Sequence, residues 1–496
     1  MSIVSLRSLL LLVIGVGVGA CAVGPDFKRP APPKTDSYTT SSLPAQTADP
    51  QGTGGGAQKF LFNQDISGQW WTLFQSPPLD ELIHQALRNS PSLVAAQATL
   101  RQAQETLSSR SGALYLPQVD LNPSATRQKT SGASFGVPGF PSSIFNLYNA
   151  SVNVSYALDI FGASRRTLEG LRAQVDYQQY QLQGAYLTLT ANIVTTALQE
   201  ASLRAQLDAT QDILTAQETQ LRVTQRQFDL GAVGRSEVLT QRTELAQTRA
   251  TLPALEKALA QTRHQLAVLL GELPNVEGLA EFNLATLHLP LDLPVSLPSS
   301  LVRQRPDILA SEALLHQASA EVGVATANLY PQINLSGSFG YQATRVGDVF
   351  NGSNEVWSIG ASLLQPLFHG GELTAKRRAS IAAYEEAAAQ YRQTVLQAFK
   401  NVADALRAIE ADARALESQN DAAALAQDSL NLTQRQFDLG AVSYLSLLTA
   451  QRQYQQARLN QVQAQAMRYA DTAALFQALG GGWWNEPAPQ TSTQAH

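Results

Sequence analysis

A ten-residue segment, TQRQFDLGAV, occurs twice in this chain, at residues 224–233 and again at residues 433–442. A duplication that keeps one segment intact indicates a place where both copies do the same mechanical job. The flanking sequence is helical in pattern on both sides, and the single glycine in each copy can adopt the left-handed conformation that ends a helix. Each copy therefore predicts the tip of a long antiparallel helical hairpin, within an internal two-fold repeat.

Composition excludes several classes of function. The 496 residues carry a formal net charge of -5, and no basic run stands out, which argues against a nucleic-acid partner. The 6 histidines are scattered and the only cysteine is Cys21, so we expect neither a metal site nor a cofactor. No nucleophile elbow or nucleotide-binding loop occurs in the sequence, and we do not expect an enzyme.

The N-terminus has the layout of a secretory signal. Arg7 precedes a short apolar stretch that ends in small residues before Cys21, and this stretch is too short to span a membrane. A lone cysteine at this point resembles the lipobox of bacterial lipoproteins, in which cleavage leaves an N-terminal cysteine that carries fatty-acyl chains such as palmitate. The alternative is a free thiol in an exported protein. Ala22 follows instead of aspartate, and in such signals this favours the outer membrane.

Two kinds of secondary structure dominate the rest. Residues 79–112 have a helical pattern, as do the proline-free stretches 164–230 and 372–439, each of which would be on the order of 100 Å long. In the last stretch a stripe of apolar residues recurs at steps of three and four, which favours coiled-coil packing over an ordinary bundle core. Period-two alternation predicts four strands, at 119–122, 151–160, 333–342 and 357–363, with a loop at 130–143 between the first two.

The four strands suit a lipid-facing barrel wall, because they alternate apolar and polar residues and carry aromatic side chains. On pattern alone, a half-buried hairpin on a helical body is an equal alternative. Four strands cannot close a barrel, since the smallest known closures need about eight and open edges in lipid leave backbone groups unpaired. Three chains would supply twelve strands. The sequence therefore predicts a homotrimer.

Several motifs then resemble a known family. They are Cys21 to Pro30, the Trp70-Trp71 pair, the segment from Arg305 to Pro331, Leu269-Leu270-Gly271 before Pro274, and both repeated tips. Together they resemble the outer-membrane factor lipoproteins, the TolC-like and NodT-like exit ducts of tripartite efflux systems. The resemblance implies a membrane α+β fold: a trimeric 12-stranded outer-membrane β-barrel, four strands per chain, continued by a long periplasmic α-helical coiled-coil barrel.

The resemblance also implies a function. The chain would be the outer-membrane channel of a tripartite efflux pump, lipid-anchored in the bacterial outer membrane and extending into the periplasm. It would passively conduct small toxic molecules received from a periplasmic adaptor protein and an inner-membrane pump of the resistance-nodulation-division type. A duct for type I polypeptide secretion has the same architecture and is an alternative. A lipid-anchored periplasmic adaptor is a weaker one, because it has one hairpin and no need of four amphipathic strands.

The resemblance assigns two sets of site residues. The adaptor-docking tips would be Leu230, Gly231, Ala232, Leu439, Gly440 and Ala441. The periplasmic gate would include Leu445, Ser446 and Thr449, where relatives carry aspartates; an apolar ring of Leu445 could close the tube instead. Arg235 and Glu237 are the remaining charged gate candidates, with a solvated pair at a helix end as the alternative reading.

The sequence also suggests a division of the chain. The expected segments are a signal peptide at 1–20, a lipid-anchored linker and equatorial segment at 21–78, a first structural repeat at 79–272, a Pro-rich equatorial connection at 273–304, a second repeat at 305–480 and a C-terminal tail at 481–496.

Overall fold

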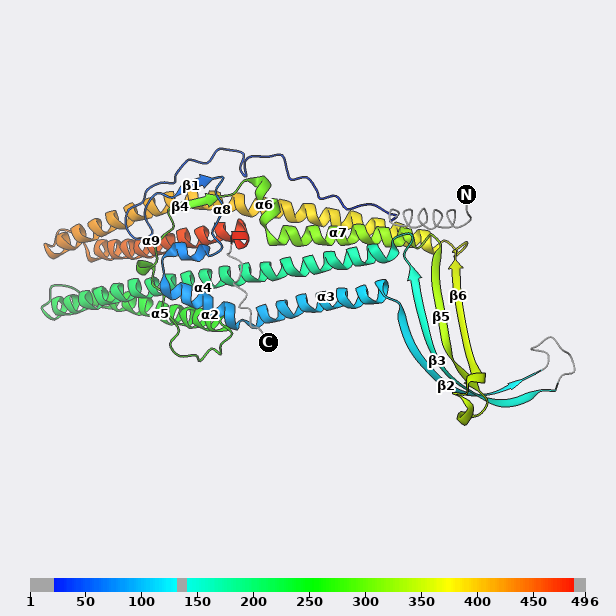
Figure 1. Ribbon diagram of the computed structural model, residues 1–496. Coiled ribbons are helices and arrows are strands. Elements are labelled where there is room, and N and C mark those ends of the chain that lie inside the picture. Colours follow the sequence, from blue (N-terminus) through cyan, green and yellow to red (C-terminus); the bar gives the residue numbers. More distant parts are fainter. Residues whose placement is uncertain (1–21, 132–140, 486–496) are drawn as a thin grey trace. The chain divides into compact units, whose positions relative to one another are not determined.

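The computed structural model describes residues 22–131 and 141–485, which belong to two compact units (Figure 1). The strand unit comprises residues 1–30, 98–179 and 310–392. The helical unit comprises residues 31–97, 180–309 and 393–496. The predicted signal peptide at 1–20, Cys21 and most of the predicted tail lie outside the described residues.

Helices, 3₁₀ turns and strands follow one another along the chain. In order they are β1 (Lys59–Phe62), η1 (Trp70–Phe74), α2 (Pro77–Asn89), α3 (Pro91–Tyr115), β2 (Gln118–Thr130), β3 (Ser143–Leu158), α4 (Ala163–Asp229), α5 (Arg235–Leu269), η3 (Leu284–Thr286), β4 (Asp292–Val295), α6 (Pro298–Gln304), α7 (Pro306–Ala327), β5 (Gln332–Ala343), η4 (Val346–Asp348), η5 (Gly352–Asn354), β6 (Glu355–Leu364), α8 (Glu372–Asp438), α9 (Tyr444–Ala478) and η6 (Trp483–Asn485).

The two predicted long helices are confirmed within one residue at each end. Helices α4 and α8 contain 67 residues each, and the return helices α5 and α9 contain 35 each. In α8 the predicted apolar stripe is buried from Tyr391 onward through Val402, Leu406 and Ile409. Among the described residues, no helix has the length and apolarity needed to cross a membrane.

The predicted helix at 79–112 differs from the structure, which has two helices there. Helix α2 ends at Asn89, Ser90 has extended backbone angles (φ -63°, ψ 119°), and α3 begins at Pro91. A residue before proline is pushed out of the helical region by the proline ring, so the chain breaks at this point. The apolar pattern continues through the break, which is why periodicity alone suggested one helix.

The strand unit contains an antiparallel sheet in the order β2-β3-β5-β6 (Figure 1). All four predicted strands are present. Strands β2 and β6 extend beyond the predicted bounds at both ends, and β5 does so by one residue at each end. Strand β3 begins earlier than predicted, at Ser143, and ends two residues earlier, at Leu158. The order leaves β2 and β6 as the edges of the sheet. The loop predicted at 130–143 is described only in part, since residues 132–140 lie outside the described residues.

The register of the sheet separates its residues into an apolar and a polar face. Cross-strand partners lie on the same face of an antiparallel sheet. One row joins Leu121, Val152, Phe339 and Trp357, and the adjacent row of paired residues contains Asp120, Asn153, Ser338 and Ser358. The apolar row is exposed, with 69% of Leu121 and 69% of Trp357 accessible in the single chain. A contiguous apolar face of this kind indicates a surface that contacts protein or membrane instead of water.

The N-terminal segment is fastened to the strand unit by charged and aromatic contacts. The Val23 amide donates to the Phe161 carbonyl at 3.1 Å. The buried Arg166 binds Asp26 and Glu169, both at 2.7 Å. The Phe27 ring stacks on His316 with centroids 4.3 Å apart. These contacts fix the beginning of the described chain beside the junction of β3 with α4.

The helical unit has an aromatic core at the level of η1. Trp70 is 1% exposed, and its ring lies against Phe74 and Phe476 with centroid distances of 6.5 and 5.6 Å. Tyr469 packs on Phe74, and burial raises the pKa of its hydroxyl to about 12. This cluster joins η1, which precedes both hairpins in the sequence, to α9 near the end of the chain.

We predict that Trp70→Ala lowers the stability of the helical unit by about 3–5 kcal/mol, because it removes a fully buried aromatic ring and leaves a cavity. Urea unfolding of the detergent-solubilised protein checks this value. Trp70→Phe retains a ring and should lose less. Equal midpoints for Trp70→Ala and the parent protein would remove this cluster from the core.

Candidate functional site

The two hairpin tips have the same backbone structure. In the first, Gly231 donates to the Phe228 carbonyl at 2.9 Å and Ala232 donates to the Gln227 carbonyl at 2.8 Å. In the second, Gly440 and Ala441 make the equivalent bonds to Phe437 and Gln436 with the same lengths, 2.9 and 2.8 Å. This pair of bonds is the Schellman motif, which satisfies the last carbonyls of a helix and requires a left-handed residue. Gly231 and Gly440 supply it, with φ of 77° and 74°.

The tips also present the same surface. The two leucines that precede the glycines, Leu230 and Leu439, are 85% and 84% exposed. A Cβ atom at either glycine would meet nothing within 4 Å. Large apolar side chains held this far into solvent on a rigid turn indicate a contact surface.

The predicted gate residues occupy the first two turns of α9. Ser446 takes part in helix capping, because its amide donates to the Ser443 hydroxyl at 3.3 Å. The Thr449 hydroxyl donates to the Leu445 carbonyl at 2.9 Å, so its hydrogen bond stays within α9. Leu445 itself is 69% exposed. Of these three side chains, the leucine is the one whose apolar surface is left without cover in the single chain.

The charged candidates lie at the start of α5. Glu237 accepts a hydrogen bond from the Ser236 hydroxyl at 2.8 Å, and this bond, together with bonds from the backbone amides, lowers the pKa of its carboxyl. An acidic side chain in the first turn of a helix also complements the helix dipole. This arrangement supports the helix-end reading of Glu237. Arg235 is exposed at the first position of the same helix.

Sequence reasoning missed two contacts that join α9 to α5. The Tyr444 hydroxyl donates to the amide oxygen of Gln241, and the Arg452 guanidinium binds the carboxylate of Glu244 through two nitrogens. Gln241 is fully buried and Glu244 is 6% exposed. Burial raises the pKa of Tyr444 to about 12, so its hydroxyl stays protonated as a donor at neutral pH. We call these two contacts the latch.

Nothing local in the sequence identifies the latch. The partners are 203 and 208 residues apart, and each belongs to a different hairpin. A Gln and a Glu in the polar stretch of α5 look like solvated helix residues until the second hairpin is placed beside them. Only the pairing of the two return helices shows that they are buried.

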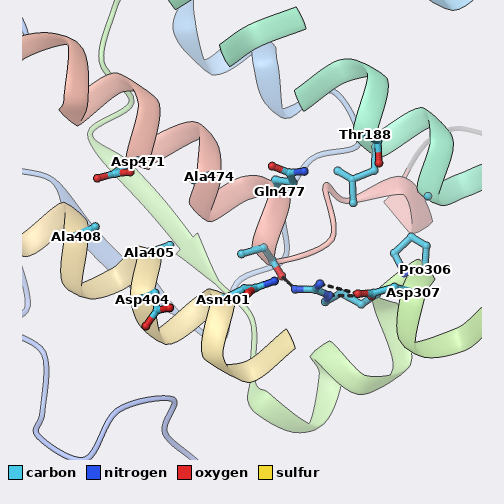
Figure 2. Close-up of a pocket in the computed structure, with 14 residues that line it drawn as sticks. Thr188, Pro306, Asp307, Asn401, Asp404, Ala405, Ala408, Asp471, Ala474 and Gln477 are labelled. Carbon is cyan, nitrogen blue, oxygen red and sulfur yellow. Dashed lines mark hydrogen bonds and ion pairs between the residues drawn. The ribbon is translucent and has the colours of Figure 1, made fainter. Parts of the chain in front are cut away.

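The helical unit contains a second polar region. It surrounds a cavity of about 530 Å³, which is lined by residues of α4, α7, α8 and α9 (Figure 2). Figure 2 shows Asp404 and Asp471 on one side and Asp307 on another. Arg305 is held by Asp307 through bonds of 2.9 and 2.7 Å and donates to the Ala478 carbonyl at 2.7 Å. Among the described residues, no group of three His, Cys, Asp or Glu side chains could hold a metal ion.

Asp471, which lines this cavity, forms a carboxyl pair with Asp412. Burial, a hydrogen bond with Asp471 and the charge of Asp471 together raise the pKa of Asp412 to about 7, against the opposing charge of Arg468. A carboxyl group buried beside a second carboxyl group ionises less easily, so Asp412 keeps its proton up to near-neutral pH.

Comparisons with known proteins agree with this architecture. A family profile described as "Outer membrane efflux protein" matches residues 82–272 and 297–481, which is more than half of the chain. The pyoverdine export outer membrane protein OpmQ of Pseudomonas aeruginosa is 34% identical over 425 residues, covering 84% of this chain and 88% of that protein. The probable efflux pump outer membrane protein TtgC of Pseudomonas putida is 28% identical over 498 residues, covering 99% and 98%.

Solved structures agree as well. The outer-membrane channel OprN superposes with a TM-score of 0.83 at 28% identity, covering 93% of this chain and 100% of that one. The structure of CusC, at 23% identity and a TM-score of 0.80, has the same fold. The chain belongs to the outer membrane efflux protein family, and it acts in the outer membrane as the channel component of an efflux system. The periplasmic-adaptor alternative is thereby removed.

The Asp412 pair predicts a pH dependence of stability. The folded carboxyl keeps its proton up to about pH 7, whereas an unfolded aspartate releases it near pH 4. The folded state therefore binds more protons between these values, and stability should fall as pH rises from about 4 to about 7 and then level off. Asp412→Asn should flatten this slope and be more stable than the parent at pH 8, as measured by urea unfolding across pH. Asp404→Asn, in the same helix and exposed, should keep the slope. An unchanged slope in Asp412→Asn would assign it to other groups.

Proposed function

We propose that three copies of this chain form one duct, in which the twelve strands close a β-barrel in the outer membrane and the helical hairpins form a coiled-coil tube in the periplasm. The observation that carries this proposal is the sheet, which has an exposed apolar face and two open edges. In lipid, an open edge would leave a row of backbone groups unpaired. Closure of the sheet with further copies removes both edges.

The strand directions suit this closure. Each neighbouring pair in the sheet is antiparallel, so β6 runs opposite to β2. An edge-to-edge contact of β6 with β2 of the next copy therefore continues the antiparallel ladder. The register gives such a barrel an apolar outside and a polar inside, as a water-filled channel in a membrane requires.

The proposed lipid anchor agrees with the contacts of the N-terminal segment. Ala22, the residue after Cys21, lies against Gly162, where an added Cβ would come within 2.8 Å of it. Gly162 follows β3 and precedes α4. A fatty-acylated Cys21 would thus begin beside the end of the sheet, where acyl chains could enter the inner leaflet of the outer membrane. The linker at 21–78, the connection at 273–304 and the C-terminal tail would contribute to an equatorial belt of shorter elements.

The tips would bind a periplasmic adaptor, which links the duct to an inner-membrane pump. Six residues form the proposed contact: Leu230, Gly231, Ala232, Leu439, Gly440 and Ala441. Helices α4 and α8 support this role, because 67 residues at about 1.5 Å each give the reach that such a link needs. OpmQ is named for pyoverdine export and TtgC for efflux, and both names favour small molecules as the cargo of this chain.

The gate would lie just beyond the second tip. In this proposal three copies of Leu445 form an apolar ring that closes the tube by contact and dewetting. The latch would hold α9 against α5 and so keep the ring closed. Ser446, Thr449, Arg235 and Glu237 would line the same region without forming a ring of opposing charges.

We predict that Leu445→Ala raises the single-channel conductance in planar bilayers, because the ring loses apolar surface and the closed tube admits water. Cells that carry the variant should also become sensitive to vancomycin. Leu425→Ala, an exposed leucine elsewhere on the helices, is the matched control. Conductance equal to that of the parent would remove Leu445 from the gate.

A second prediction concerns the tips. Gly231→Arg and Gly440→Arg should weaken docking, because a non-glycine residue at positive φ costs about 1–2 kcal/mol and the arginine crowds the contact. Site-specific cross-linking to the adaptor measures the loss. Asparagine tolerates this backbone conformation, so Gly231→Asn should dock nearly as well as the parent. Full cross-linking of both arginine variants would show that the adaptor binds elsewhere.

A further inference from the structure

A glutamine-lined cavity lies between the two helical hairpins, within the helical unit. Its volume is about 410 Å³, and it is bounded by α4, α8 and α9. Glutamines from all three helices face it: Gln217, Gln220, Gln427, Gln434, Gln451 and Gln455. A cavity of this size falls in the range of small-molecule sites.

Two of these glutamines are buried with an amide atom left over. Gln217 is 3% exposed and Gln220 is 8% exposed. The Gln217 side-chain nitrogen donates to the Thr248 hydroxyl at 3.0 Å, which fixes the orientation of the amide. Its Oε1 then has no partner in the structure, and neither has Nε2 of Gln220. A buried polar atom without a hydrogen bond lowers the stability of the fold by about 1–3 kcal/mol. A ligand that forms hydrogen bonds with these two atoms would therefore bind favourably.

We propose that this cavity binds a small uncharged molecule that carries both a donor and an acceptor, of the carboxamide class. The free acceptor on Gln217 matches an amide N–H, and the free donor on Gln220 matches an amide carbonyl. Ile213 and Leu430 offer an apolar surface for the rest of the molecule. The lining contains one acidic and one basic residue, Asp212 and Arg458, so its net charge is zero. Arg458 already donates to Gln461 at 2.6 Å.

The cavity is connected to the latch. The Gln241 side-chain nitrogen contacts the backbone oxygen of Gln217 at 3.5 Å, and the amide oxygen of Gln241 accepts from Tyr444. A ligand bound to Gln217 therefore also restrains Gln241, the residue to which Tyr444 of α9 donates. Such a ligand stabilises the closed pairing of the hairpins. This effect on the channel rests on the proposed function, whereas binding itself does not.

The binding test uses benzamide and the full-length protein in detergent, with saturation-transfer NMR as the readout. Benzamide should bind, and benzoate, which carries a charge, should bind at least tenfold more weakly. Gln217→Leu and Gln220→Leu should each weaken benzamide binding at least tenfold. Ala216→Phe fills the cavity without changing a buried glutamine, so it tests the site even if the leucine variants fold poorly. Gln211→Leu, at an exposed position of the same helix, should bind like the parent.

The outcomes separate the two proposals. Absence of benzamide binding to the parent protein, or equal binding to Ala216→Phe, would show that benzamide does not occupy this cavity and would overturn the inference. The same samples are measured in planar bilayers, where benzamide should lower the open probability of the parent and leave Ala216→Phe unaffected. Channels that conduct but do not respond to benzamide would overturn the coupling alone. A protein that binds benzamide but forms no channel would contradict the proposed function and leave the site standing.

Discussion

The unpaired edges of the four-stranded sheet are the constraint on which the proposed assembly depends. The sheet exposes apolar residues such as Trp357 and Ile359 on one face, while β2 and β6 each have an edge that pairs with no other strand among the residues the structure describes. Lipid can cover the apolar face but cannot pair the edges. Copies of the chain can do both at once. A barrel closed by three chains therefore accounts for a sheet that a soluble monomer would have to bury.

In the proposed trimer, the hairpin tips of the helical unit would be repeated three times. Each hairpin ends in a Schellman turn at Gly231 or Gly440, so the exposed leucines of both tips are held by the same backbone geometry. Two similar surfaces per chain would give a trimer six similar contacts for an adaptor. Leu445 and Tyr444 of the latch lie just beyond the second tip, so the proposed docking would occur close to the proposed gate.

Much of this architecture could be predicted from the sequence. Helices α4 and α8 and the positions of the four long strands follow from periodicity, because a repeat of apolar residues at helical or strand spacing marks one face of an element. The break at Pro91 was missed, since the apolar pattern continues through it. The latch and the buried pair Gln217 and Gln220 could not be predicted either. They are polar residues on long polar helices, and only the packing of one hairpin on the other buries them.

Disulfide cross-linking between the sheet edges tests the central claim most directly. Asp120→Cys on β2 is combined in turn with Ser358→Cys, Gly360→Cys or Ser362→Cys on β6, and each single variant serves as a control for Cys21. These residues share one face of the sheet. The proposed closure predicts that at least one pair oxidises to a covalent trimer on non-reducing gels, and that reduction returns it to monomer. Monomers in every pair, or a ladder that continues past three chains, would contradict a barrel built from three sheets.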